Sequence, residues 1–237
     1  MHTQEKGTHL HEKLNELLKT DRLPTVVEDV EADTFRTQNT NNNSGEPYTS
    51  GFHFSAPQTD LGRFNDPNGK LKVCYVAQTA TSALAEIFCR NKKRDLADQS
   101  SFYIGSSDLE TRSVSHLKTK RKLRLLDLGS LLPMLGYTLD ELTGPSYKVT
   151  QEIVLFFSEV EDELINGVAY PSRHLGDRKL CYAIWTNESE PHILETQSIV
   201  PVSKFRTTQE LPSFWSDKDI VGEEILTEVL GFKVVED

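Results

Sequence analysis

Three side chains that could act on one ligand lie close together between residues 62 and 86. Arg63 offers forked donors that bind phosphate, Tyr75 offers an aromatic face with a polar tip, and Glu86 offers a carboxylate. These three types suit different parts of a dinucleotide that has a pyrophosphate and a cationic leaving group. The segment therefore admits nucleotide chemistry as well as the ordinary packing of a folded domain.

Each of these residues also has an ordinary structural interpretation. Glu86 lies at the edge of a helical stripe, where it could form an exposed i,i+4 pair with Arg90 worth a few tenths of a kcal/mol. Tyr75 could be a core tyrosine whose hydroxyl finds some partner, and Arg63 could be a surface arginine on a strand. Taken one at a time, the residues favour these structural roles.

The sequence leaves the relation between Arg63 and Tyr75 open. Asp66-Pro67-Asn68-Gly69 is a strong turn signal, and Leu71–Ala77 has the best strand pattern of the chain. A simple hairpin around this turn would set Arg63 opposite Lys72 and on the other face of the sheet from Tyr75. A slip of one residue reverses the faces, and like charges directly opposite each other are disfavoured.

Other periodic segments predict a mixture of helices and strands. We expect helices at residues 9–18, at 80–91 with Thr79 as N-cap, at a short segment where Thr138 and Glu141 have capping-box spacing, at 147–160 and at 217–230. We expect strands at residues 34–37, 52–54, 71–77, 123–128, 167–170, 180–185, 199–200 and 232–235, and a polar loop at residues 38–50. Because these elements are interspersed without strict alternation, the predicted fold is α+β (mixed α/β), a single domain with a central mixed sheet flanked by helices.

Composition and charge narrow the classes of function. The 237 residues can bury a core, and no apolar run approaches the about 20 residues that cross a bilayer. The N-terminus lacks the apolar core of a secretory signal, so a cytoplasmic protein without membrane contact is expected. The net charge of −10 disfavours direct nucleic-acid binding. One basic run is expected to be a solvated loop that enters the strand at 123–128: Lys118, Lys120, Arg121, Lys122 and Arg124.

Several common site types are disfavoured. Cys74, Cys89 and Cys181 are odd in number and widely spaced, which argues against a disulfide framework and a CxxC metal knuckle. Ser172 and His174 lack a GxSxG elbow and lie two apart, so a serine hydrolase is disfavoured. HExxH, Walker A and GxGxxG motifs do not occur, and neither a metal site nor a Rossmann loop is predicted.

Four segments, in this order, resemble the RES-domain family. They are Gly62-Arg63-Phe64-Asn65, Tyr75-Val76-Ala77, Ala83-Leu84-Ala85-Glu86 and Tyr170-Pro171-Ser172. The family is named for its arginine, glutamate and serine, and many members are the toxin halves of bacterial toxin–antitoxin pairs. The resemblance runs from about residue 34 to residue 201, and Phe35-Arg36-Thr37 looks like the family's opening strand. Leu61 and Phe64 stand where the family usually has a glycine and a tryptophan.

The resemblance implies a fold related to ADP-ribosyltransferase toxins, with NAD⁺ as the substrate in a cleft beside the sheet and no metal. It implies cleavage of the nicotinamide–ribose bond by hydrolysis or phosphorolysis, which would deplete cellular NAD. The alternatives are an ADP-ribosyltransferase that modifies a protein target and a catalytically silent nucleotide-binding module. An Xre-type antitoxin is the expected partner, and the chain could form a homo-oligomer. On this view residues 34–205 form the NAD-processing domain, residues 1–33 an N-terminal helical extension, and residues 206–237 a C-terminal helix and strand on the same domain.

The resemblance also assigns roles within the expected site. Glu86 would stabilise the cationic sugar, and Ser172 would orient Glu86 or a substrate hydroxyl. Tyr75 would pack against the nicotinamide end, and Arg36 and Arg63 would hold the pyrophosphate or the adjacent ribose. The candidates of second rank are Asn65, His53 and His174.

Overall fold

The computed structural model of the chain describes residues 2–57, 59, 61–91, 93–94, 102–160, 165–188, 192–209, 211, 213 and 215–237. Its α-helices are α1 His2–Lys19, α2 Ala80–Phe88, α3 Ser106–Thr111, α4 Leu128–Leu135, α5 Asp140–Thr143, α6 Lys148–Glu159 and α7 Gly222–Glu224. Short 3₁₀ turns cover Cys89–Asn91 and Val202–Lys204, and a π-helical turn covers Ile225–Val229. The strands are β1 Thr25–Glu28, β2 Asp33–Asn39, β3 Lys72–Ala77, β4 Lys93–Arg94, β5 Phe102–Gly105, β6 Arg112–Thr119, β7 Leu123–Asp127, β8 Gly167–Ser172, β9 Gly176–Thr186, β10 Leu194–Pro201, β11 Arg206–Thr207, β12 Ile220–Val221 and β13 Phe232–Val235.

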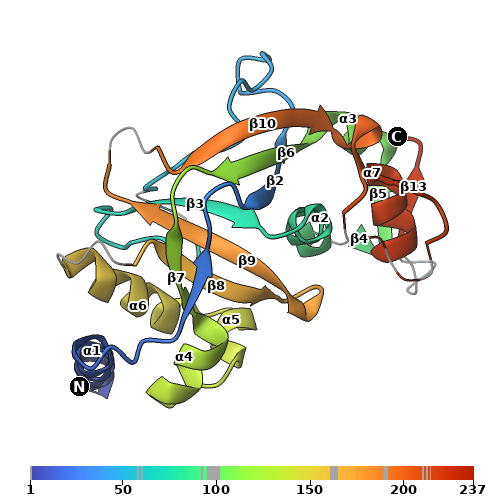
Figure 1. Cartoon of the computed structure of the whole chain (residues 1–237). Helices are drawn as coiled ribbons and strands as arrows, with labels where there is room; N and C mark the ends of the chain where they lie inside the picture. Colours follow the sequence, from blue (N-terminus) through green and yellow to red (C-terminus); the bar gives the residue numbers. More distant parts are fainter. Residues whose placement is uncertain are drawn as a thin grey trace.

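Within the described residues, eight strands form one central sheet in the order β1-β7-β8-β9-β3-β2-β6-β10 (Figure 1). Neighbouring strands are antiparallel except for β7 and β8, which are parallel. A parallel pair needs a long crossover connection, and α4, α5 and α6 lie in the one between β7 and β8. The central sheet is therefore mixed, which confirms the predicted α+β class.

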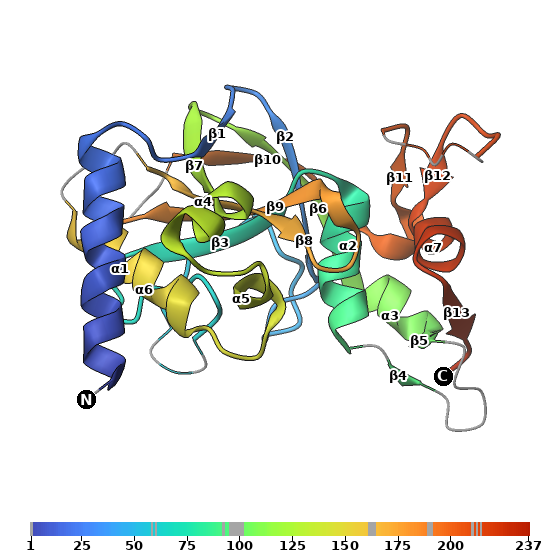
Figure 2. The same cartoon turned by 90° about the horizontal axis from the view of Figure 1, so that it is seen from below.

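Helices α1, α4, α5 and α6 gather at one end of the molecule (Figure 2). Their apolar side chains form one core cluster with residues from β3, β7, β8 and β9. Leu10 and Leu14 of α1 are buried in this cluster, and the Lys13 ammonium donates to the Leu135 carbonyl at 3.2 Å. The N-terminal helix therefore packs as part of the core.

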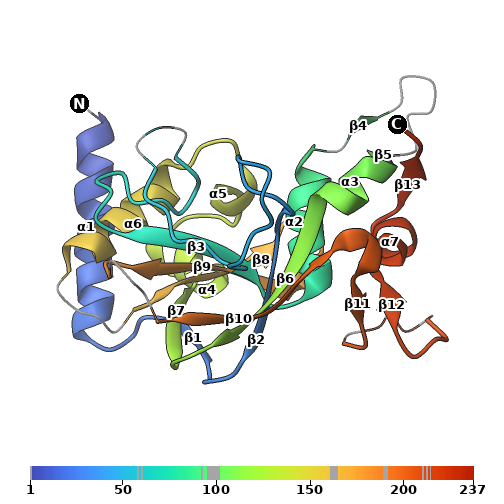
Figure 3. The same ribbon diagram turned by 90° about the horizontal axis from the view of Figure 1, so that it is seen from above.

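A second core cluster lies at the other end, where α2, α3, α7 and β13 gather (Figure 3). Helix α2 begins as predicted, because the Thr79 side chain accepts a hydrogen bond from the Ser82 amide. Tyr170 of β8 packs against both the first and the second cluster. The two termini lie at opposite ends, so the chain starts beside one cluster and ends beside the other.

Two strands of the central sheet were not predicted. Strand β1 is a four-residue edge strand that pairs with β7, and β6 pairs with both β2 and β10. The basic run expected as one loop in fact begins in β6 with Lys118 and ends in β7 with Arg124. Its five side chains form surface ion pairs with carboxylates of Glu31, Glu195, Glu188, Asp29 and Asp21.

Three local predictions were wrong. Residues 52–54 form no strand, and Phe52 and Phe54 instead pack against a third apolar cluster, with an isolated bridge at Ser55. The helix expected at 217–230 begins only at Gly222, because Ile220–Val221 pairs with Arg206–Thr207 as a strand, and it continues as a π-helical turn to Val229. Helix α5 begins after Leu139 without a side-chain cap, so Thr138 forms no capping box. No helix in the described part of the chain is long and apolar enough to span a membrane.

Replacing Gly167 with alanine is expected to lower the free energy of unfolding by about 2–4 kcal/mol. Gly167 has a φ of +151°, and an added Cβ would collide with the main-chain oxygen of Ala183 on β9. Gly45→Ala is the matched control, because Gly45 has a φ of +86° with nothing near an added Cβ. That variant should lose only about 1 kcal/mol. Urea unfolding measures both, and equal losses would contradict the close approach of β8 to β9.

Candidate functional site

A cavity of about 310 Å³ opens where β2 and β3 separate. The two strands share one register pair, Phe35 with Ala77. Beyond that pair, Arg36 and Thr37 of β2 and Tyr75 and Val76 of β3 line the cavity instead of forming a continuous ladder. Its volume is within the range typical of small-molecule sites. The fold thus builds a ligand-sized hollow into the centre of its own sheet.

The turn that carries Arg63 is fixed by buried polar groups. The Asn65 side chain accepts a hydrogen bond from the Gly62 amide at 2.7 Å, and the Tyr75 hydroxyl accepts one from the Phe64 amide at 3.1 Å. A Cβ on Gly62 would lie 2.5 Å from Asn65 Oδ1 and 2.9 Å from the Tyr75 oxygen, so glycine is required there. This turn is no strand, and the hairpin considered for Arg63 and Lys72 does not form.

The Arg63 guanidinium is held at the rim of the cavity by α5 and the connection that follows it. It donates to the main-chain oxygens of Glu141 at 2.5 Å and Gly144 at 2.7 Å, and lies 4.3 Å from the centre of the Tyr147 ring. Burial lowers the pKa of Arg63, and the neighbouring Arg173 charge lowers it further. An arginine has five N–H groups, so donors remain for a ligand.

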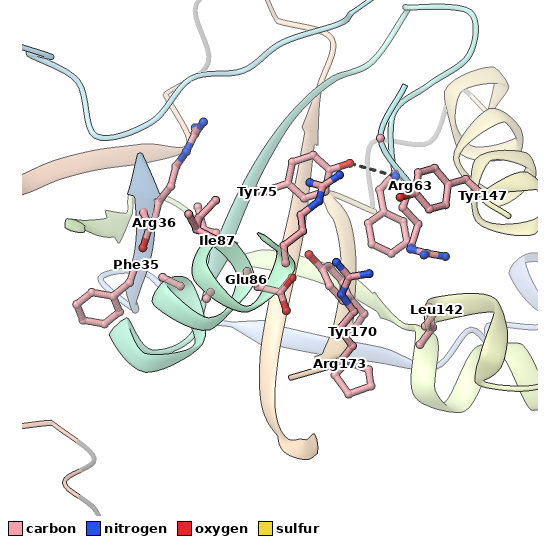
Figure 4. Close-up of a pocket in the computed structure, with 18 residues that line it drawn as sticks. Phe35, Arg36, Arg63, Tyr75, Glu86, Ile87, Leu142, Tyr147, Tyr170 and Arg173 are labelled. Carbon is pink, nitrogen blue, oxygen red and sulfur yellow. Dashed lines mark hydrogen bonds between the residues drawn. The ribbon is translucent and has the colours of Figure 1, made fainter. Parts of the chain in front are cut away.

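Glu86 lies on α2 and lines the same cavity (Figure 4). The Ser172 hydroxyl donates to Glu86 Oε1 at 2.9 Å and in turn accepts a hydrogen bond from the His174 amide at 3.3 Å. Ser172 is 1% exposed, so this bond is shielded from water. The structure forms no ion pair between Glu86 and Arg90, both of which it describes. Glu86 is therefore oriented by β8 and is not part of the surface pair considered above.

Two tyrosines, Tyr75 and Tyr170, line the cavity together with Glu86 and Arg63. The Phe64 ring packs against Tyr170 at 4.7 Å and against Tyr75 at 6.4 Å between ring centres. Burial raises the pKa of Tyr75 to about 12, and burial together with the Glu86 charge raises the pKa of Tyr170. Both phenols are neutral at physiological pH, so they can donate hydrogen bonds to a ligand but cannot serve as strong bases.

Arg36 borders the cavity, but its guanidinium is directed away from Glu86 (Figure 4). It donates to the His53 main-chain oxygen at 3.3 Å and contacts Cys74 Sγ at 3.5 Å. Side chains alternate along a strand, so Phe35 and Thr37 share one face of β2 and Arg36 takes the other. The structure thus brings Arg63, Tyr75, Glu86, Ser172 and Asn65 together, and places Arg36 and the His53 main chain at the far end.

Among the lining residues that were not predicted as part of the site, the arginines and tyrosines bear most on ligand binding: Arg90, Tyr147, Tyr170 and Arg173. Arg90 follows Glu86 by one helical turn, and Arg173 directly follows Ser172. Their closeness in the sequence to predicted site residues is the signal that could have identified these two arginines. Among the described lining residues there are four arginines and one carboxylate, in a chain whose net charge is −10. The cavity therefore concentrates positive charge and suits an anionic ligand. Within the described residues, His, Cys, Asp and Glu side chains form no group placed to hold a metal ion.

Comparisons with known proteins agree on the architecture. A family model described as the RES domain matches residues 35–207. No curated protein sequence matches the chain. Among solved structures, a chain of the M. tuberculosis MbcT–MbcA toxin–antitoxin complex is similar, with 13% sequence identity and a TM-score of 0.54 over 94% of this chain and 97% of that chain. At this identity the likeness concerns the fold, and it supports the mixed α/β assignment.

Proposed function

The chain belongs to the RES-domain family, and from this premise we propose that it is a toxin-like enzyme that cleaves the nicotinamide–ribose bond of NAD⁺. The observation that carries the proposal is one cavity that joins a fixed carboxylate, Glu86, to the guanidinium groups of Arg63, Arg90 and Arg173. A dinucleotide presents the matching charges, since its pyrophosphate is anionic and its nicotinamide ribose becomes cationic during cleavage.

In the proposed bond cleavage, the leaving group, the sugar and the attacking oxygen each have a defined role. The bond between ribose C1′ and the nicotinamide nitrogen breaks, and its electron pair goes to nicotinamide, which leaves as a neutral molecule. Positive charge then develops on the sugar, where the Glu86 carboxylate stabilises it. An oxygen of water or phosphate forms the new bond to C1′, and an attacking water passes its proton to Glu86 or to solvent.

The arginines anchor the part of the substrate that does not react. Arg63, fixed by the Glu141 and Gly144 carbonyls, and the exposed Arg173 would contact the pyrophosphate or adjacent ribose. Tyr75 and Tyr170 would border the nicotinamide end as neutral hydrogen-bonding groups. Such anchoring converts remote binding energy into correct placement of the reacting carbon.

Incubation of the pure protein with NAD⁺ tests the proposal directly. We expect release of free nicotinamide, measured by chromatography. NAD⁺ labelled in its adenosine half identifies the acceptor: free ADP-ribose indicates hydrolysis, a product that requires added phosphate indicates phosphorolysis, and label on protein indicates ADP-ribosyl transfer. If NAD⁺ stays intact under all conditions while calorimetry detects its binding, the result would contradict the proposed enzymatic activity and favour a catalytically silent binding module.

We propose an antitoxin partner that covers the cavity. The support is family membership together with the similar fold in a chain of a toxin–antitoxin complex. The expected partner is an Xre-type protein with a helix-turn-helix domain, encoded beside this chain. Co-expression of that neighbour should suppress NAD⁺ cleavage by the purified complex, whereas undiminished cleavage by the complex would contradict a blocking partner.

A further inference from the structure

A buried thiol contacts Glu86 without lining the cavity. Cys181 of β9 is 1% exposed, and its Sγ donates to Glu86 Oε1 over 3.7 Å. Burial raises the pKa of the Cys181 thiol, and the Glu86 charge raises it further, so the thiol keeps its proton. A protonated thiol is a hydrogen-bond donor, and here its acceptor is the carboxylate of the cavity.

The Ser172 hydroxyl donates to that same oxygen, Oε1, at 2.9 Å. Ser172 and Cys181 come from neighbouring antiparallel strands, β8 and β9, whereas Glu86 comes from α2. No described residue donates to the second oxygen, Oε2. Two donors from the sheet thus hold one oxygen of Glu86, and the other oxygen is left for a ligand in the cavity.

We propose that Cys181 is a positioning residue that acts together with Ser172 to fix the plane of the Glu86 carboxylate. A single donor leaves the carboxylate free to pivot about one hydrogen bond, whereas two donors from different strands restrict that rotation. The restriction keeps Oε2 directed toward the sugar on which charge develops. This inference rests on the proposed function for its kinetic consequence, but the hydrogen bond itself can be tested without NAD⁺.

Infrared spectroscopy tests the hydrogen bond. The S–H stretch lies apart from other protein bands, and a hydrogen bond lowers its frequency. The difference between wild type and Cys181→Ser identifies the Cys181 band, and the same difference in a Glu86→Leu background shows that band without its acceptor. We expect a higher frequency in the Glu86→Leu background. The Cys74 band, identified with Cys74→Ser, is the internal control and should not move. An unchanged Cys181 band would overturn the proposal.

Kinetics then test the positioning role. Cys181→Val removes the donor and keeps an apolar side chain, whereas Cys181→Ser keeps a donor. We expect Cys181→Val to lower kcat for NAD⁺ cleavage about fivefold, as for loss of one weak hydrogen bond from a thiol, with KM unchanged. Cys181→Ser should recover most of the loss, with both variants checked by urea unfolding. Equal kcat in the two variants would mean that Cys181 only fills space and would overturn the proposal. Absence of NAD⁺ cleavage in wild type would instead reject the proposed function. The infrared result would then decide alone whether Cys181 donates a hydrogen bond to Glu86.

Discussion

Glu86→Gln is expected to lower the turnover of NAD⁺ cleavage by about 100-fold or more, the loss typical of removing one preorganised electrostatic group. The substitution keeps the size of the side chain and removes its charge. The amide oxygen of glutamine can still accept the hydrogen bond from Ser172, so the local structure should persist. Nicotinamide release under saturating NAD⁺ gives the turnover, and calorimetry gives the affinity for NAD⁺, which should change little.

Ser172→Ala is the matched control for Glu86→Gln. It removes a donor to Glu86 Oε1 but leaves the charge of Glu86 in place. We therefore expect a smaller loss of turnover, on the order of 10-fold. Urea unfolding of both variants separates loss of activity from loss of folding. Near-normal NAD⁺ breakdown by Glu86→Gln would refute the role assigned to its charge.

The second large effect is expected for Arg63→Ala, which should weaken NAD⁺ binding by about 10–100-fold and lower turnover as well. The loss has two causes. A charge at the rim of the cavity disappears, and the bonds from the guanidinium to the Glu141 and Gly144 carbonyls are lost. Arg63→Lys keeps the charge but cannot reproduce the forked geometry, so an intermediate affinity is expected. Calorimetric titration with NAD⁺ measures all three proteins.

Arg121→Ala is the control for net charge, because it removes one positive charge from an exposed ion pair with Glu188. Exposed pairs contribute little to stability, and the affinity of this variant for NAD⁺ should equal that of wild type. A similar loss in Arg121→Ala and Arg63→Ala would attribute the effect to net charge alone. Unchanged affinity in Arg63→Ala would count against Arg63 as an anion-binding residue.

Local signals predicted the elements around the cavity. The turn at Asp66–Gly69 forms because the Asp66 carboxylate accepts hydrogen bonds from the amides of Asn68, Lys70 and Leu71. Strand β3, the N-cap at Thr79 and the strands β8 and β9 were predicted for the same reason, since turn residues, caps and apolar alternation lie within a few positions. The arrangement of these elements around one cavity required the resemblance to a family.

Elements whose stability depends on distant partners could not be predicted. Strand β6 carries buried polar residues, Ser113, Ser115 and Thr119, so its sequence does not show the expected apolar pattern. Pairing with β2 and β10 stabilises it instead. The pattern at residues 217–230 has helical spacing, and residues 222–229 are helical, but pairing of Ile220–Val221 with Arg206–Thr207 replaces its first turn.

The sequence also does not predict the direction in which single side chains point. Arg36 was expected to hold the pyrophosphate or the adjacent ribose; it borders the cavity, but the sequence did not show that its guanidinium bonds the His53 carbonyl and is directed away from Glu86. Arg63 was considered as a strand residue, but the buried Asn65 and the Tyr75 hydroxyl hold it in a turn. These outcomes depend on hydrogen bonds between residues that are separated in the sequence, such as Arg36 with His53 and Phe64 with Tyr75, and composition and periodicity do not report such bonds.

The place of Tyr170 in the molecule limits how the protein can diversify. The same ring packs against both apolar clusters and borders the cavity, and it lies against Phe64 beneath the Arg63 turn. A substitution that reshaped this pocket wall would also remove apolar surface that joins the two ends of the fold. Selection for a new ligand at that position thus carries a trade-off with folding stability, and adaptation is easier at the exposed arginines.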